Sequence, residues 1–195
     1  MEKLLKLYAL TGGIGSGKSS ALVFLREAGY FTLSSDRIVS ELYEKRSVKK
    51  ILKSLFPTAV NGFFRLTIDR KKIAELAFNN PDLHQKLTDT ITPLVLEEIK
   101  KRTQDLSGIA FVEVPLLFEC GYQNEFDGVI VIARDKADRI ESVKQRSNLT
   151  EQEVLARMAK QIDYDGFDLT PYIIIKNDGD QEALKEKVLS FAKTL

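Results

Sequence analysis

The chain has little sulfur and little histidine. Its 195 residues include one cysteine, Cys120, and one histidine. A single cysteine excludes an intramolecular disulfide and any cysteine-based zinc site, because both require several thiols. We therefore expect a protein of a reducing compartment, the cytoplasm.

Long apolar runs and a charge excess of one sign are also missing. No stretch approaches the ~20 apolar residues of a membrane span, and Met1-Glu2-Lys3 lead directly into a short apolar run, which leaves no room for a signal peptide. The formal net charge of +1 gives no broad basic surface for nucleic acid. We expect partners that are neither membranes nor nucleic acids. The 44% hydrophobic content is enough for a sizeable core.

What the chain does have is a glycine-rich pattern near its start. Residues 12–19 read Gly-Gly-Ile-Gly-Ser-Gly-Lys-Ser and fit G-x-x-x-x-G-K-[ST]. An apolar run of strand length over 4–10 precedes the pattern, and a helical pattern over 20–28 follows it and stops at Gly29. A glycine-rich turn that binds nothing is the alternative, which the flanking strand and helix disfavour. The sequence predicts a loop that binds a nucleoside triphosphate.

Each residue type of this loop has a chemical role. Glycines let the backbone fold so that its N–H groups point at phosphate oxygens, and the following helix adds the positive end of its dipole. Lys18 reaches the β- and γ-phosphates, and the Ser19 hydroxyl ligates Mg²⁺. The residues predicted to bind ATP here are Gly13, Ile14, Gly15, Ser16, Gly17, Lys18, Ser19 and Ser20.

Carboxylates follow the next predicted strands. Asp36 comes after a short strand over 30–33, at a position typical of a helix N-cap. Because ligands of parallel sheets lie beyond the carboxyl ends of the strands, Asp36 is equally placed to activate the hydroxyl of a phosphoryl acceptor. One residue can have both roles. Glu113 stands near the end of a buried strand over 109–114, where phosphate-loop enzymes keep an acid near Mg²⁺, and Glu119 is a further carboxylate on this edge.

Two stretches interrupt the alternation of strands and helices. Residues 47–106 predict a mostly helical insertion, in which Asp69 and Arg70 either face solvent or meet an anionic acceptor. Residues 134–169 predict two charged helices, with a capping box of Thr150 and Glu153 at the second. These helices form either a salt-bridged pair or a lid whose arginines close over the triphosphate. Strands over 128–133 and 172–176 and a helix over 181–193 complete the expected elements.

With these features in place, the chain resembles the dephospho-coenzyme A kinase family over nearly its whole length. The phosphate loop alone is shared by many kinases, whereas its combination with Pro-Leu-Leu-Phe-Glu and a late Arg-x-x-x-Gln is more specific. The segments that carry the resemblance are 10–19, Asp36, 68–70, 77–81, Pro115-Leu116-Leu117-Phe118-Glu119, Gln145-Arg146, Arg157-Met158-Ala159-Lys160-Gln161, Asn177 and Gly179.

The resemblance implies a fold and an activity. The fold is an α/β three-layer sandwich of the P-loop type, a single domain over 1–195 with a five-stranded parallel sheet. Its nucleotide-binding core spans 1–46, 107–133 and 170–195, its helical acceptor-binding insertion 47–106 and its lid 134–169. The activity is ATP- and Mg²⁺-dependent phosphorylation of the ribose 3′-hydroxyl of dephospho-coenzyme A, the final step of coenzyme A biosynthesis. We expect a monomer or a weak homo-oligomer.

The resemblance also assigns residues. The catalytic residues expected are Asp36, Lys18, Arg146 and Arg139. Arg157 and Asn177 join the ATP site, Asn177 beside the adenine end. The metal ligands expected are Ser19 and Glu113. The residues expected to bind the acceptor are Asp36, Asp69, Arg70, Phe78, Pro93, Leu116 and Glu119.

Some positions depart from the family pattern and leave two alternatives. Ser34 replaces an acid, Thr92 a histidine, Glu113 an aspartate and Ser142 a lid arginine, for which Arg139 is the candidate substitute; Pro171-Tyr172 replaces Ala-Asp. One alternative is another small-molecule or nucleotide kinase of the same fold, against which the insertion's pattern argues. The other is a regulatory module that binds nucleotide and has lost transfer activity. Retention of Lys18, Ser19, Asp36 and Glu113 together argues against it, because a binder needs no base.

Overall fold

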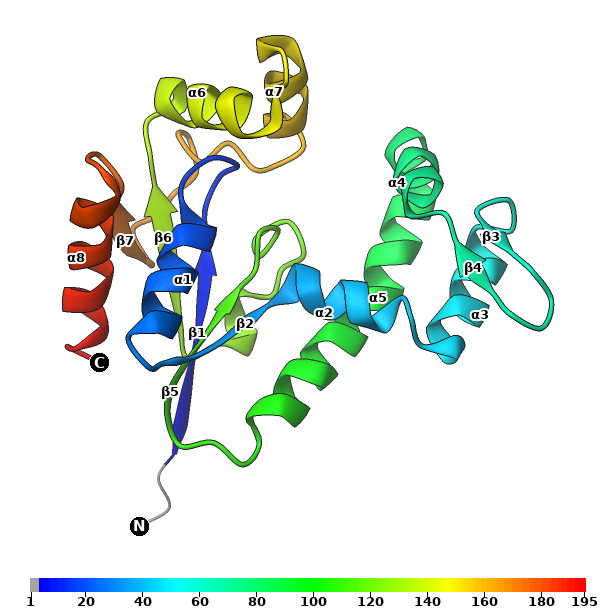
Figure 1. The fold of residues 1–195 in the computed structure, drawn as a ribbon, viewed down its shortest axis with the longest axis horizontal. Helices are drawn as coiled ribbons and strands as arrows, with labels where there is room; N and C mark the ends of the chain where they lie inside the picture. The colour runs from blue at the N-terminus through cyan, green and yellow to red at the C-terminus, as the bar shows by residue number, and fades with distance from the viewer. Residues whose placement is uncertain (1–3) are drawn as a thin grey trace. The chain divides into compact units, whose positions relative to one another are not determined.

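A parallel β-sheet organises the chain, which the computed structural model describes over residues 4–195. The expectation that Met1-Glu2-Lys3 lead directly into the first strand concerns residues outside this range. In spatial order the five strands are β2 (Phe31–Ser34), β5 (Gly108–Glu113), β1 (Leu5–Thr11), β6 (Gly128–Ala133) and β7 (Ile173–Lys176). Every neighbouring pair is parallel, which confirms the predicted five-stranded sheet (Figure 1).

The chain divides into two compact units. The core unit comprises the chain up to Ser35 together with Asp105–Leu195, and the inserted unit comprises Asp36–Gln104. The core unit holds the sheet with α1 (Lys18–Glu27), α6 (Lys136–Ser147), α7 (Glu151–Met158), α8 (Gln181–Ala192) and the 3₁₀ turn Gln123–Glu125. The inserted unit holds α2 (Ser35–Leu42, from Asp36 on), α3 (Arg46–Leu55), β3 (Val60–Asn61), β4 (Thr67–Ile68), α4 (Arg70–Asn79) and α5 (Pro81–Thr103).

The inner strands β5 and β6 are buried on both faces, which is why they are nearly continuous apolar runs. Successive residues of a strand point to opposite faces. Tyr8 and Leu10 pack in one cluster with residues of α1 and α8 such as Leu25 and Val188. Ala9 packs in the other cluster, which consists otherwise of strand β6 and of loop residues from 114–126 and 164–172.

The carboxyl ends of the strands lie at one edge of the sheet. Leu10 and Ser34 both pair with Glu113, Thr11 pairs with Val131, and Ala133 pairs with Lys176. The segments that leave these strand ends therefore begin side by side. They include the glycine-rich loop after β1 and the turns after β5, β6 and β7.

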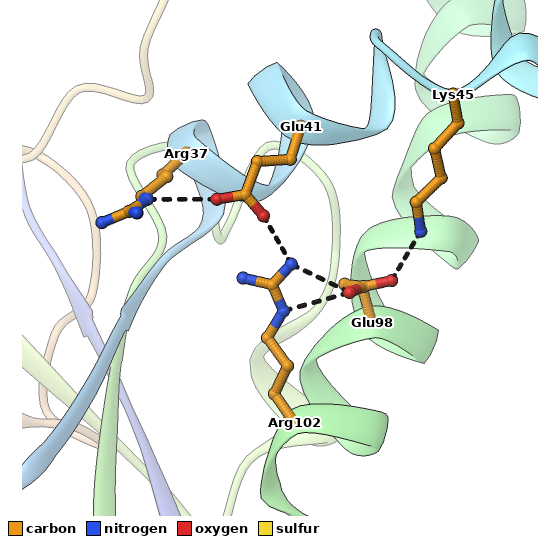
Figure 2. A network of polar contacts seen from close by, with 5 residues as sticks. All are labelled: Arg37, Glu41, Lys45, Glu98 and Arg102. Carbon is orange, nitrogen blue, oxygen red and sulfur yellow. Dashed lines mark hydrogen bonds and ion pairs between the residues drawn. The ribbon is translucent and has the colours of Figure 1, made fainter.

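Within the inserted unit, a network of ion pairs connects α2 and the turn that follows it to α5. Arg102 donates from Nη2 to Glu41 Oε2 at 2.5 Å and to Glu98 Oε1 at 2.8 Å, and Lys45 Nζ donates to Glu98 Oε2 at 2.8 Å. Arg37 Nε donates to Glu41 Oε1 at 3.1 Å (Figure 2). The pKa of Glu98 is lowered to about 2, mainly by the hydrogen bond from Lys45 and next by the hydrogen bond from Arg102.

Three details of the sequence-based prediction need correction. Helix α2 begins at Ser35 directly after β2, so Asp36 lies in its first turn and is not an N-cap. The inserted unit contains a short antiparallel pair, β3 with β4, which we did not predict. Strand β2 begins one residue later than expected.

In residues 4–195, no helix has the length and apolarity required to cross a membrane.

Candidate nucleotide-binding site

The loop between β1 and α1 has a backbone that requires glycine at defined positions. Gly12, Gly15 and Gly17 have φ values of 142°, 79° and 101°. A Cβ at Gly12 would lie 2.4 Å from the Ile132 carbonyl oxygen, and a Cβ at Gly17 would lie 2.6 Å from Asn177 Nδ2. The loop is therefore held both by its left-handed backbone angles and by close neighbours.

Lys18 folds back over this loop. The side chain is buried, and Nζ donates to the carbonyl oxygens of Gly12 at 2.7 Å and Gly13 at 3.0 Å. Within the loop, the Ser16 N–H donates to the Gly13 carbonyl at 3.1 Å. The ammonium charge thus stands at the loop, the place where a bound triphosphate needs a cation.

Ser19 and Glu113 come together although they are far apart in sequence. Ser19 Oγ donates to Glu113 Oε1 at 2.7 Å, and Glu113 is only 8% exposed at the end of β5. Mg²⁺ prefers oxygen ligands and is usually held by one or two carboxylates together with waters and substrate phosphates. This donor pair fits that ion. The part of the chain that the structure describes has no group of three or more His, Cys, Asp or Glu able to hold a metal, which a site of this kind does not need.

Asn177 braces the loop from the turn after β7. Its Nδ2 donates to the Ser16 carbonyl at 2.8 Å, and its backbone N–H donates to the Ala133 carbonyl at 2.7 Å. The side chain is therefore used by the phosphate loop itself. The predicted contact with the adenine end of ATP stays a prediction.

Arg139 of α6 packs directly against the loop. It is 5% exposed, and its Nη2 donates to both carboxylate oxygens of Asp165, at 2.8 and 3.1 Å. A Cβ on Gly13 would lie 2.4 Å from its Nη1. Two further arginines of the segment predicted to form a lid, Arg146 and Arg157, are exposed on α6 and at the end of α7.

A small cavity lies between the loop and the segment that follows α7. Its volume is about 30 Å³. The polar side chains in its wall are Arg134, Arg139, Tyr164 and Asp165. The Tyr164 hydroxyl oxygen lies 3.3 Å from Thr11 Oγ1. Burial raises the pKa of the Tyr164 phenol to about 12. Sequence reasoning missed Tyr164 and Asp165, because Asp163-Tyr164-Asp165-Gly166 has the composition of an ordinary loop.

Two residues of the Pro-Leu-Leu-Phe-Glu segment were predicted to bind the acceptor. Leu116 is 41% exposed, whereas Glu119 Oε1 accepts the N–H of Ile162 at 2.9 Å. Gln161, quoted in the resemblance but not assigned to the site, accepts the Ile14 N–H through Oε1 at 2.6 Å. Nothing in the sequence indicated this contact between Gln161 and the phosphate loop, because the two residues are far apart along the chain.

The other predicted acceptor-binding residues belong to the inserted unit. Asp69 caps α4 by accepting the Lys72 N–H at 3.0 Å, and Arg70 donates to the Ser40 carbonyl and to Glu44 Oε1, each at 3.0 Å. Phe78 is 58% exposed on α4, Pro93 is exposed inside α5, and Asp36 is exposed in the first turn of α2. Acceptor binding by these residues stays a prediction.

These features define the class of protein. A parallel sheet carries a G-x-x-x-x-G-K-[ST] loop at its carboxyl edge, with a lysine folded onto the loop and a serine–carboxylate pair beside it. The combination is that of a P-loop kinase.

Comparisons with known proteins give the particular family. The model of the dephospho-CoA kinase family matches residues 6–183. The dephospho-CoA kinase of Thermus thermophilus is 33% identical, covering 92% of this chain and 86% of that protein. A crystal structure from Thermus thermophilus has a TM-score of 0.87 at 31% identity, covering 99% of each chain. The dephospho-CoA kinase of Campylobacter jejuni has a TM-score of 0.69 at 25% identity, covering 97% of this chain and 96% of that one. The chain belongs to the dephospho-CoA kinase family and is a kinase.

Proposed function

We infer that this chain transfers the γ-phosphate of ATP to the ribose 3′-hydroxyl of dephospho-CoA, which yields CoA and ADP, the final step of CoA biosynthesis. The match to the family supports the substrate pair. The structural observation that carries the proposal is the cluster of Lys18, Ser19 and Glu113 at the glycine loop. The comparisons give no support to another small-molecule kinase or to a regulatory module.

The phosphate loop and Lys18 bind the triphosphate in this proposal. The Ile14 and Ser16 N–H groups already donate within the protein, to Gln161 Oε1 and to the Gly13 carbonyl. The other loop amides of residues 13–20 and the N-terminus of α1 supply donors and positive potential for the β- and γ-phosphates. Before ATP binds, Lys18 Nζ is held by the Gly12 and Gly13 carbonyls. We propose that the ammonium turns from these carbonyls to the phosphate oxygens, which are stronger acceptors.

Ser19 and Glu113 are the residues that would hold Mg²⁺. When bound, the ion neutralises charge on the β- and γ-phosphates. Glu113 keeps the Ser19 hydroxyl oriented at 2.7 Å, so this pair orders the oxygen ligands before the ion arrives.

Asp36 is our candidate for the base. Its position in the first turn of α2, shortly after Ser34 at the carboxyl end of β2, supports this role. An aspartate within hydrogen-bond reach of the ribose hydroxyl orients it and accepts its proton as the bond to phosphorus forms. Asp69, Arg70, Phe78, Pro93, Leu116 and Glu119 are our candidates for binding the rest of the acceptor.

Arginines are our candidates for stabilising the charge of the transferring group. Arg139 is already packed against Gly13, whereas Arg146 and Arg157 stand exposed on the two helices of the proposed lid. We propose that Arg139, whose guanidinium is oriented by Asp165, lies fixed beside the loop and that the exposed pair completes the ATP site on closure. Asn177, already fixed beside the loop, is our candidate for the adenine end of ATP. We also propose a cytoplasmic location and a monomer or weak homo-oligomer.

A panel of acceptors tests the function. The purified chain is incubated with Mg-ATP and, in separate reactions, dephospho-CoA, adenosine, AMP, gluconate or shikimate, and ADP release is measured. We expect release only with dephospho-CoA, and a product whose phosphorus NMR signal is that of a 3′-phosphomonoester. Release with another acceptor of the panel, and none with dephospho-CoA, would contradict the proposal.

A further inference from the structure

Gln161 joins three segments of the core unit through one side chain. Its Oε1 accepts the N–H of Ile14 in the phosphate loop at 2.6 Å, and its Nε2 donates to the carbonyl oxygen of Pro115 at 3.3 Å. We refer to this pair of hydrogen bonds as the Gln161 bridge. An amide side chain can accept and donate at once, which neither a carboxylate nor an apolar group can do.

The bridge begins at the end of the lid helix α7. The backbone continues past Met158 in helical turns, since Lys160 N–H donates to the Arg157 carbonyl at 3.3 Å and Gln161 N–H donates to the Met158 carbonyl at 3.0 Å. One residue later the Ile162 N–H is held by Glu119 Oε1 at 2.9 Å. Gln161 therefore has little freedom relative to α7 on one side and to the Pro-Leu-Leu-Phe-Glu segment on the other.

The bridge ends at the most adaptable part of the loop. Ile14 stands between Gly13 and Gly15, and glycines give a backbone many conformations. The loop's other hydrogen bonds reach different atoms. Lys18 Nζ and the Ser16 N–H donate to the Gly13 carbonyl, at the opposite side of the same peptide unit, and Asn177 donates to the Ser16 carbonyl. Gln161 is the partner of the N–H side of this peptide.

We propose that Gln161 is a positioning residue that couples the end of the lid to the phosphate loop. It holds the Ile14 peptide in the orientation that transfer requires, and a movement of α7 reaches the loop through its side chain. The inference rests on the proposed kinase function, because it concerns the loop that binds ATP. Displacement of reacting groups by ~1 Å can cost on the order of 100-fold in rate, so a loose loop affects turnover more than binding.

Two variants and one control test the coupling. Gln161→Met keeps the length of the side chain and removes both hydrogen bonds. Gln161→Glu keeps an acceptor for Ile14 and removes the donor to Pro115. Gln152→Met makes the same chemical change at an exposed position of α7. The readouts are Ile14 amide hydrogen exchange without nucleotide, kcat and KM for ATP with dephospho-CoA, and the melting temperature.

For Gln161→Met we expect Ile14 exchange to accelerate at least ~10-fold and kcat to fall ~10–100-fold, while KM for ATP changes less than ~3-fold. For Gln161→Glu we expect Ile14 to stay protected and KM for ATP to rise, because a carboxylate stands beside the bound phosphates. Gln152→Met should match the wild type in every readout.

Unchanged Ile14 exchange in Gln161→Met would overturn the inference, as would faster exchange with unchanged kcat. A fall in kcat accompanied by a loss of melting temperature of more than ~10 °C would also overturn it, since that result indicates general destabilisation. Failure of the proposed function is distinguishable. In that case the wild-type chain does not turn over dephospho-CoA, while the exchange of Ile14 still reports whether the bridge exists.

Discussion

The glycine at position 12 illustrates how a single residue shapes the phosphate loop. Its φ of 142° is strained for any residue with a Cβ, and that atom would lie 2.4 Å from the Ile132 carbonyl of the neighbouring strand. We predict that Gly12→Ala lowers the free energy of unfolding by about 1–3 kcal/mol and weakens ATP binding at least ~10-fold. Urea unfolding and calorimetric titration with ATP measure the two effects.

Gly29→Ala is the matched control for this prediction. Gly29 also has a positive φ, 91°, but a Cβ there would meet nothing within 4 Å. We expect a loss of about 1–2 kcal/mol from backbone strain alone and an unchanged affinity for ATP. Equal ATP affinities of the two variants would contradict the importance of the close approach at Gly12.

Glu113 is the residue on which the proposed magnesium site depends. We predict that Glu113→Gln raises the Mg²⁺ concentration for half-maximal ADP release by ~10–100-fold, because the charge that faces the ion and orients Ser19 is lost. Removal of divalent cations with EDTA should abolish turnover of the wild type. Glu186→Gln, on the exposed side of α8, is the control. An unchanged Mg²⁺ requirement in Glu113→Gln would refute this assignment.

At the scale of elements, Glu98 of α5 carries a charge that pairs with Lys45, in the turn between α2 and α3, and with Arg102, which in turn pairs with Glu41 of α2. The Glu98 pKa of about 2 lies below the ordinary 4.5, so the contribution of Glu98 to stability is complete above about pH 4.5 and is lost as the pH falls toward 2. We predict that Glu98→Gln is less stable by about 1 kcal/mol at pH 7 and that this difference from the wild type disappears between those two pH values.

Urea unfolding of the full chain at several pH values measures the effect. Glu97→Gln, a neighbouring exposed glutamate on the same helix, is the control and should leave stability unchanged. A difference between Glu98→Gln and the wild type that persists undiminished at pH 2 would contradict the network as the cause.

An element can be predicted from the sequence when the pattern that signals it lies within a few neighbouring residues. The strands β5 and β6 are apolar runs because both of their faces are covered, and the glycine loop has a pattern of its own. The β3–β4 pair was missed because Val60–Asn61 and Thr67–Ile68 are too short for a period to show. The cap expected at Asp36 was wrong because β2 passes into α2 without a turn.

Within the site, too, contacts signalled by a local pattern were predictable and contacts between distant segments were not. Lys18, Ser19 and Glu113 occupy positions defined by a motif and by a strand end, so their meeting was predictable. The pairing of Arg139 with Asp165 and the bridge from Gln161 to Ile14 join residues whose contacts depend on how the chain returns to the loop after α7. No local pattern encodes such contacts.

At the scale of the whole molecule, our proposal assigns ATP to the core unit and the acceptor, dephospho-CoA, to the inserted unit. We predict that ADP slows amide hydrogen exchange in the loop and the start of α1, residues 12–20, and around Asn177. Dephospho-CoA should slow exchange within the inserted unit, Asp36–Gln104. Both substrates protecting the core unit alone would contradict the assignment of the inserted unit to the acceptor.

The central claim is that the chain phosphorylates dephospho-CoA with Asp36 as the base. Its most direct test is steady-state ADP release with Mg-ATP, with and without dephospho-CoA, for the wild type and Asp36→Asn. We predict turnover that requires the acceptor and falls at least ~100-fold in the variant, while ATP still binds. ATP binding without any stimulation by dephospho-CoA would contradict the claim of kinase activity, and full activity of Asp36→Asn would contradict the assigned base.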